Sequence, residues 1–193
     1  SHKQFDESTA ILAGDALLTY AFQLIGRHYA DTPNIGMELL SIIGETAGSE
    51  HLIGGQVEDI LGESKKLTPE ELDYIHLNKT SAMIEASIGL GAIAGQADES
   101  QFEALQQYGR AIGLAFQIID DILDATSDTQ TMGKTVGSDA QLNKTTYVSL
   151  HGLERSRDFA NSLTQSALDA CSELEGDTEF LEGLANYLNT RIN

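Results

Sequence analysis

Hydrophobic residues recur at three- and four-residue steps along most of the chain, and the alternation typical of β-strands is rare. This spacing places apolar side chains on one face of a helix. The pattern therefore predicts an all-α fold, and 193 residues are enough for a single domain, spanning residues 1–193, with a continuous core. The expected helices cover about residues 7–27, 37–61, 99–125, 144–150, 153–174 and 178–191.

One more helix has a clear start signal in the segment LTPEEL. Thr68 suits the N-cap position, Pro69 suits the first helical position, and acidic residues follow in the first turn. This helix is expected to end at Leu77 or to continue after a break into KTSAMIEASIGLGAIAG. The small residues of that stretch favour close packing by a neighbouring helix; a cavity for a long apolar ligand is the alternative.

Three glycines, Gly48, Gly54 and Gly55, fall inside the second expected helix, residues 37–61. Glycine destabilises a helix interior relative to alanine. These positions therefore indicate close approach of another helix or of a ligand.

The segment AFQIIDDILDATSD, residues 115–128, brings acidic residues into a helix patterned for burial. At 100° per residue, Asp124 lies about 40°, Gln117 about 60° and Asp121 about 100° from Asp120, so these polar groups share one arc of the helix. Phe116 lies about 40° from Asp120 on the other side and belongs to the core-facing stripe. The carboxylates are therefore expected at the edge of the core.

Three carboxylates on one arc repel one another and are costly to desolvate, so a cation is expected beside them. Mg²⁺ is suited to such a site, because it is bound through one or two carboxylates together with substrate phosphates. The alternative is a solvated acidic face. Acidic residues near a helix C-terminus oppose the helix dipole, however, and Lys134 and Lys144 follow in a chain with few lysines. The combination indicates a metal-bridged phosphate site.

The net charge of −19 argues against nucleic-acid partners and against electrostatic attachment to anionic membranes. No uninterrupted run of about 18 apolar residues occurs, so no membrane span is expected. The single cysteine, Cys171, excludes an intrachain disulfide and fits a reducing compartment. The sequence thus predicts a cytoplasmic protein without integral membrane association.

Five blocks of the sequence, in order, resemble the trans-prenyl diphosphate synthases, and bacterial farnesyl diphosphate synthases most of all. They are HKQFDESTAILAGDALLTYAF at 2–22, GGQVEDI at 54–60, HLNKT at 76–80, GLAFQIIDDILD at 113–124, and GKTVGSD with NKTTY between 133 and 147. The motif DDILD alone is weak, whereas five blocks in register are specific. The resemblance implies an all-α isoprenoid synthase bundle.

The resemblance also implies roles for individual residues. Asp120, Asp121 and Asp124 match the second aspartate-rich motif, whose carboxylates hold Mg²⁺ against an allylic diphosphate. The residues matching those that contact or line the substrate site are Lys79, Thr80, Lys134, Gln117, Lys144, Phe116 and Gln56, with Lys79 and Lys134 also taken as catalytic. The implied reaction condenses an allylic diphosphate, dimethylallyl or geranyl, with isopentenyl diphosphate, in an enzyme that is usually a homodimer.

Other polar residues keep structural interpretations. His28, His51, His76 and His151 are expected to be surface residues or hydrogen-bonded ones without a catalytic role. For Asp15 and Asp59, burial as hydrogen-bond partners and a role in the site both stay open.

The family pattern includes a first aspartate-rich motif, paired arginines and basic residues for isopentenyl diphosphate, and the 193 residues contain none of these. We therefore expect an N-terminally truncated synthase that is inactive alone. The alternatives are a non-catalytic subunit of a heteromeric synthase, a longer-chain geranylgeranyl or polyprenyl synthase, and a helical scaffold without activity.

Overall fold

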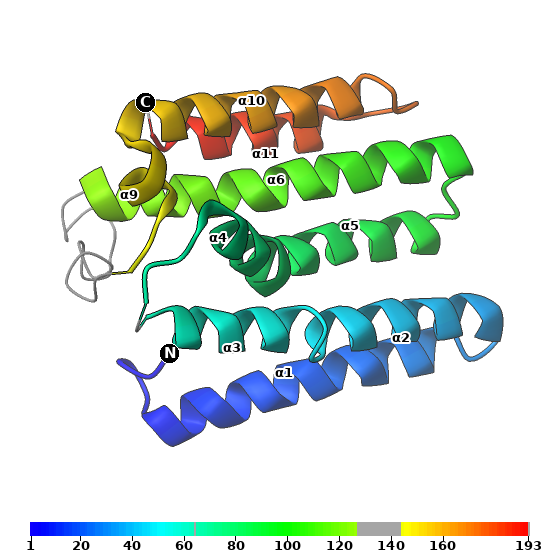
Figure 1. Cartoon of the computed structure of the whole chain (residues 1–193). Helices are drawn as coiled ribbons and strands as arrows, with labels where there is room; N and C mark the ends of the chain where they lie inside the picture. The colour runs from blue at the N-terminus through cyan, green and yellow to red at the C-terminus, as the bar shows by residue number, and fades with distance from the viewer. Residues whose placement is uncertain (64, 127–143, 193) are drawn as a thin grey trace. The chain divides into compact units, whose positions relative to one another are not determined.

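The computed structural model describes residues 1–63, 65–126 and 144–192, and within these ranges the regular elements are all helices (Figure 1). The all-α prediction is therefore confirmed. The chain forms two compact units, Ser1–Gly44 and Glu45–Asn193. The expectation of a single domain over residues 1–193 stays a prediction.

The first unit contains α1, Glu7–His28, and most of α2, Pro33–Ala47. Asp6 caps α1, because its side chain accepts a hydrogen bond from the Thr9 backbone N–H at 2.7 Å. No residue of α1 is buried, and among the helices of the described ranges α1 alone is long and apolar enough to cross a membrane by length and composition. Core helices of soluble proteins meet the same criterion, so the absence of a membrane span stays a prediction.

The predicted helix over residues 37–61 is wrong in one respect, because the structure divides it into α2 and α3, Leu52–Gly62. The chain turns after Ala47, and His51 has non-helical backbone angles. A Cβ at Gly54 would lie 2.3 Å from the Ser49 carbonyl oxygen, so this turn requires a glycine there. Gly54, one of the glycines that indicated close approach, thus also allows the turn between α2 and α3.

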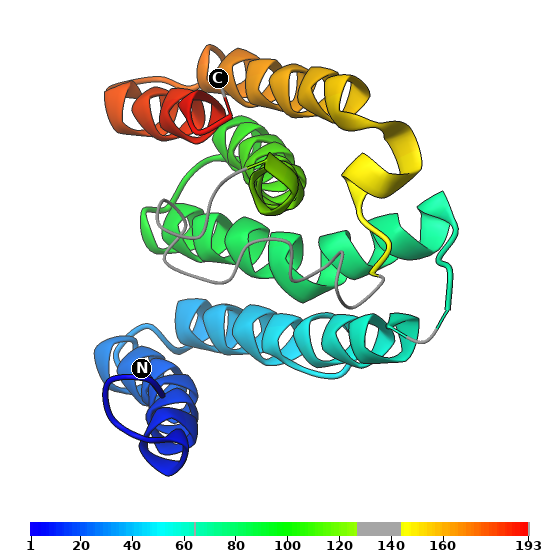
Figure 2. The same ribbon diagram turned by 90° about the vertical axis from the view of Figure 1, so that its left-hand side faces the viewer.

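The second unit is organised around α6, Glu99–Thr126. This helix packs against α10, Leu153–Cys171, on one side and against α5, Ala82–Ala94, on the other, and α11, Glu179–Thr190, lies beside α10 (Figures 1 and 2). The predicted helices 99–125, 153–174 and 178–191 are confirmed with small shifts at their ends. A short helix, α9, Tyr147–His151, contacts the C-terminal part of the bundle.

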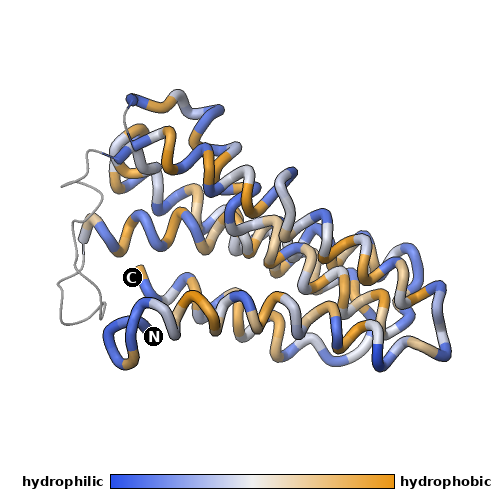
Figure 3. Tube along the Cα trace, turned by 90° about the horizontal axis from the view of Figure 1, so that it is seen from below, coloured by the Kyte–Doolittle hydropathy of each residue, from blue (hydrophilic) through white to orange (hydrophobic). Residues whose placement is uncertain are grey.

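The core lies along α6. Its buried side chains include Tyr108, Ile112, Ala115, Ile119 and Ile122, at the three- and four-residue steps seen in the sequence. Hydrophobic and hydrophilic positions are interspersed along the helices (Figure 3). The hydrophobic pattern therefore determines which face of α6 is buried.

The helix beginning at Pro69 continues through a break, as one of the two expectations had it. Thr68 and Glu71 form a complete capping box at the start of α4, Pro69–His76. A five-residue π-helical segment, η1, Leu77–Ser81, then leads into α5. Such segments inside helices are rare and occur often at functional sites.

Candidate functional site

The η1 segment is held between two helices by glycines. A Cβ at Gly55 of α3 would lie 2.5 Å from the Lys79 backbone nitrogen, and a Cβ at Gly113 of α6 would lie 2.7 Å from the Ser81 Cα. Only glycine allows these backbones to approach so closely. Residues 77–81 are thereby fixed between α3 and α6.

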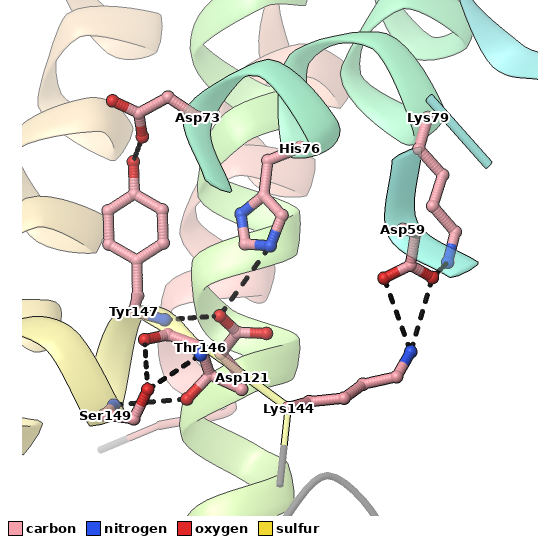
Figure 4. A network of polar contacts seen from close by, with 9 residues as sticks. All are labelled: Asp59, Asp73, His76, Lys79, Asp121, Lys144, Thr146, Tyr147 and Ser149. Atoms are coloured by element: carbon pink, nitrogen blue, oxygen red, sulfur yellow. Dashed lines mark hydrogen bonds and ion pairs between the residues drawn. The ribbon is translucent and has the colours of Figure 1, made fainter. Parts of the chain in front are cut away.

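Two lysines predicted to contact substrate meet at one carboxylate. Lys79 on η1 donates to Asp59 Oδ2 on α3 at 2.6 Å, and Lys144 reaches both carboxylate oxygens at 3.3 Å (Figure 4). Lys144 also pairs with Glu63 at 3.2 Å. Because Asp59 lies one helical turn after Gly55, the close approach at Gly55 places Lys79 opposite this carboxylate.

The charges in this cluster reinforce each other. Burial raises the pKa of Asp59, but the hydrogen bond from Lys79 and the charges of both lysines outweigh burial, so the pKa lies below its ordinary value. Burial lowers the pKa of Lys144, yet Asp59 and Glu63 raise it overall. Lys144 is therefore cationic at neutral pH, and the side chains of both lysines converge on Asp59 at a partly exposed position.

The aspartates lie near the C-terminal end of α6. Asp120 and Asp121 are partly buried, and Asp124 is buried with 4% of its surface exposed. Asp121 Oδ2 accepts a hydrogen bond from the Tyr147 backbone N–H at 2.8 Å and lies 3.8 Å from His76 Nε2 (Figure 4). The structure therefore places these carboxylates at the edge of the core, as the helical arc predicted.

His76 lies between the lysine cluster and the aspartates. Burial lowers the pKa of His76 to about 4, opposed by the negative charges of Asp73, Asp59 and Asp120, and the positive charge of Lys79 also lowers it. These charges act on one imidazole, so the lysine cluster and the aspartate end of α6 belong to one region. At neutral pH the ring is uncharged.

The expectation that His76 is a surface residue or a fully hydrogen-bonded one is wrong, whereas the absence of a catalytic role stays a prediction. The His76 side chain is buried, and within the described ranges its Nδ1 has no hydrogen-bond partner. His28 is exposed, His51 bonds Asn78 at 2.8 Å, and His151 contacts the ring of Tyr147, so these three fit the structural interpretation.

Tyr147 connects α9 to α4. Its hydroxyl donates to Asp73 Oδ1, and its ring stacks on His76 with the ring centroids 5.3 Å apart and the planes inclined by 21°. Burial, and then the hydrogen bond and charge of Asp73, raise the pKa of Tyr147 well above its ordinary value. Tyr147 is therefore a neutral donor under ordinary conditions.

The other predicted residues are placed less fully. Thr80, Gln56 and Gln117 are partly buried, and Phe116 packs against the core. Lys134 lies outside the described residues. Asp15 is exposed on α1, so it is not a buried hydrogen-bond partner, whereas Asp59 has a defined place between two lysines.

The donor groups fit Mg²⁺ in chemical type but do not form a closed cage. Among the residues that the structure describes, no group of three or more His, Cys, Asp or Glu side chains is arranged to hold a metal ion. Mg²⁺ commonly takes only one or two protein carboxylates and completes its shell with water and phosphate oxygens. The partly exposed Asp120 and Asp121 fit that mode, whereas buried Asp124 is less accessible.

Sequence reasoning missed the partners of these residues. Asp73 and His76 stand three positions apart on α4, and Tyr147 lies in the quoted block NKTTY, but their meeting at Asp121 joins segments far apart in sequence. The local signal that could have found them is that Asp73 and His76 lie three positions apart, on one face of a helix whose hydrophobic pattern predicts burial.

Comparison with known proteins agrees with this fold. The polyprenyl synthetase family matches residues 1–180. A chloroplastic geranylgeranyl pyrophosphate synthase of Catharanthus roseus is 42% identical over 199 residues, covering 100% of this chain and 55% of the relative. A farnesyl diphosphate synthase of Micrococcus luteus is 42% identical over 191 residues, covering 99% of this chain and 65% of the relative.

A solved structure shows the same architecture. The geranyltransferase of Helicobacter pylori, complexed with magnesium and isoprenyl diphosphate, superposes with a TM-score of 0.80 at 37% identity, covering 98% of this chain and 62% of that one. The fold is the all-α isoprenoid synthase fold, and the chain belongs to the polyprenyl synthetase family. It spans between about half and two thirds of the length of these relatives.

Proposed function

We propose that these 193 residues supply the allylic-diphosphate half of a Mg²⁺-dependent prenyltransferase. The complete reaction would condense dimethylallyl or geranyl diphosphate with isopentenyl diphosphate in isoprenoid biosynthesis. Farnesyl diphosphate is the proposed product, with geranylgeranyl diphosphate or a longer prenyl diphosphate as the alternative. A cytoplasmic homodimer is the proposed assembly. Relatives named for both farnesyl and geranylgeranyl products support the class of reaction without separating the products.

The convergence of Lys79 and Lys144 on Asp59 is the observation that carries this proposal. A diphosphate needs cationic donors held together before it binds, and Lys is a common phosphate ligand. Here one carboxylate keeps two ammonium groups within hydrogen-bond reach of itself, near the aspartate end of α6. A helical scaffold without activity would give no reason for this arrangement.

The proposed reaction requires the protein mainly to stabilise charge on the departing diphosphate. When bound, Mg²⁺ would offset negative charge that develops on the departing diphosphate. Lys79 and Lys144 would hold the same oxygens from the protein side. The double bond of isopentenyl diphosphate would attack the allylic carbocation and form the new carbon–carbon bond. The tertiary cation that results would lose a proton to the released diphosphate, so the chain needs no nucleophile of its own. The apolar faces beside the site would keep water from the cation.

Calorimetric titration with a non-hydrolysable geranyl diphosphate analogue, with and without Mg²⁺, tests the proposal. We expect binding that requires Mg²⁺ and that is lost in an Asp120→Ala, Asp121→Ala double variant. Asp158→Ala is the matched control, because Asp158 is an exposed aspartate on α10 and is not one of the predicted site residues. Absence of Mg²⁺-dependent binding by the folded wild-type chain would overturn the proposal.

Turnover separates the half-site from the complete reaction. The 193 residues contain one aspartate-rich segment of the DDILD type, so we expect binding of the analogue without condensation of authentic substrates. Robust condensation by the purified chain would contradict this part of the proposal. A non-catalytic subunit would gain activity only when a partner supplying the second half is added.

A further inference from the structure

The side chain of Asp121 is held from two other helices. Its Oδ2 accepts a hydrogen bond of 2.8 Å from the backbone N–H of Tyr147, which is the first residue of α9. Nε2 of His76, on α4, lies 3.8 Å from the same oxygen. These contacts approach from different elements (Figure 4). Together they restrict the rotation of a carboxylate that would otherwise turn about two side-chain bonds.

The two groups that hold Asp121 are themselves held. The rings of His76 and Tyr147 stack, and the Tyr147 hydroxyl donates to Asp73, one turn before His76 on α4. The four residues thus form a closed set of contacts, which we call the Asp121 clamp: Asp73, His76, Asp121 and Tyr147. Only 8% of the His76 side chain and 12% of the Asp121 side chain are exposed.

His76 faces Asp121 through one of its two ring nitrogens, Nε2. Within the described ranges, Nδ1 has no hydrogen-bond partner, whereas Nε2 faces the carboxylate. A proton on Nε2 therefore gains an electrostatic interaction that a proton on Nδ1 does not. The distance of 3.8 Å exceeds that of a hydrogen bond, so the N–H dipole orients the carboxylate rather than binding it tightly.

We propose that His76 and Tyr147 are positioning residues that set the orientation of Asp121 for Mg²⁺. This inference rests on the proposed function, in which Asp121 is a metal ligand. Groups that hold a ligating carboxylate commonly contribute to metal affinity, and their loss costs about 10- to 100-fold in that affinity. The clamp contains Asp121 but neither Lys79 nor Lys144. Its loss should therefore raise the Mg²⁺ concentration that binding requires more than it lowers the affinity for the diphosphate.

His76→Phe tests the clamp, because phenylalanine keeps the stacked ring and removes Nε2. Binding of the geranyl diphosphate analogue is titrated against Mg²⁺ in the 193-residue chain. We expect the Mg²⁺ concentration at half-saturation to rise at least about 10-fold, with analogue affinity at saturating Mg²⁺ nearly unchanged. His76→Gln, which can return an N–H near the position of Nε2, should recover part of this loss.

His151→Phe is the matched control. The ring of His151 on α9 contacts the ring of Tyr147, with the centroids 5.4 Å apart, and His151 is not one of the four residues of the Asp121 clamp. Its Mg²⁺ requirement should equal that of the wild type. Thermal unfolding without Mg²⁺ checks that each variant is folded.

The outcomes separate the two proposals. If the wild type shows no Mg²⁺-dependent binding, the proposed function fails and the clamp inference fails with it. If the wild type binds but folded His76→Phe keeps the wild-type Mg²⁺ requirement, the clamp inference alone is overturned. Should His76→Phe not fold, Tyr147→Phe decides, because it keeps the ring but removes the bond by which Asp73 fixes Tyr147, the residue whose backbone N–H holds Asp121, so the Mg²⁺ requirement should rise. An unchanged Mg²⁺ requirement in that variant overturns the inference.

Discussion

Among the single residues of the site, Asp59 is the acceptor that brings Lys79 and Lys144 together. Its carboxylate accepts a hydrogen bond from Lys79 and contacts from Lys144, residues 20 and 85 positions away in the sequence. Two ammonium groups this close would repel each other without a shared anion. Asp59 therefore makes the lysine pair stable before any diphosphate binds.

Replacing Asp59 with asparagine should destabilise the protein by about 1 to 2 kcal/mol, because charge-assisted hydrogen bonds to a partly buried carboxylate are lost. Urea unfolding followed by circular dichroism measures the difference. Glu154→Gln is the control, because Glu154 pairs with Arg157 at 3.2 Å while 85% exposed, and it should change stability by less than about 0.5 kcal/mol. Equal effects of the two variants would contradict the role of Asp59.

The stabilisation from Asp59 should also depend on pH. The folded-state pKa of Asp59 lies below its ordinary value of 3.8, so folding favours the charged carboxylate. Its contribution is fully present above that ordinary value and is lost as the pH falls through the folded-state pKa. The stability difference between wild type and Asp59→Asn should therefore be constant near neutrality and shrink below about pH 4. A difference that grows on acidification would have the wrong sign.

At the scale of elements, the π-helical segment η1 determines where Lys79 lies. Gly55 and Gly113 allow α3 and α6 to approach its backbone from two sides. The widened turn changes the direction in which residues 77–81 project compared with a continuous α-helix. Position on this segment, rather than the spacing of lysines in the sequence, brings Lys79 to Asp59.

Gly55→Ala should destabilise the protein by about 1 to 3 kcal/mol, because its Cβ would meet backbone atoms that cannot turn away. The displaced η1 should also weaken binding of the geranyl diphosphate analogue. Gly91→Ala is the matched control of opposite sign: a Cβ there meets nothing within 4 Å, so alanine in α5 should stabilise by about 0.5 to 1 kcal/mol. Urea unfolding and calorimetry measure the two effects. Stabilisation by Gly55→Ala would show that η1 is not held as described.

Most of the helices could be predicted from the sequence, because their faces and caps are local features. The capping box at Thr68 and the buried stripe of α6 are examples. The break between α2 and α3 could not, because glycines at 48, 54 and 55 fit equally a packed helix and a turn until the Ser49 carbonyl is placed against Gly54. The π-helical form of residues 77–81 likewise results from packing between α3 and α6.

At the scale of the whole molecule, the candidate site belongs to the unit Glu45–Asn193. Its residues come from α3, α4, η1, α6, α9 and the segment that enters α9. The sequence could predict which residue types belong to a diphosphate site, from the aspartate arc and the lysines. It could not predict that Asp59 joins the lysines or that His76 and Tyr147 hold Asp121, since these contacts depend on how distant helices pack.

Cys171 offers a probe of how this unit holds together. Only 1% of its surface is exposed at the end of α10, and burial, followed by the negative charge of Glu182, raises the pKa of its thiol. Reaction with a thiol reagent therefore requires both opening of the structure and deprotonation. At pH 8 the folded chain should react far more slowly than the chain unfolded in urea.

Bound ligand should slow this reaction further if the site and the Cys171 region open as one cooperative unit. With Mg²⁺ and the geranyl diphosphate analogue at 100 times its dissociation constant, the open population falls about 100-fold, and the labelling rate should fall by the same factor. Mg²⁺ removed by chelation should restore the original rate. A rate unchanged by saturating ligand would mean that the end of α10 opens while α3, η1 and α6 stay closed, so that the core around Cys171 and the diphosphate site unfold as separate parts of the molecule.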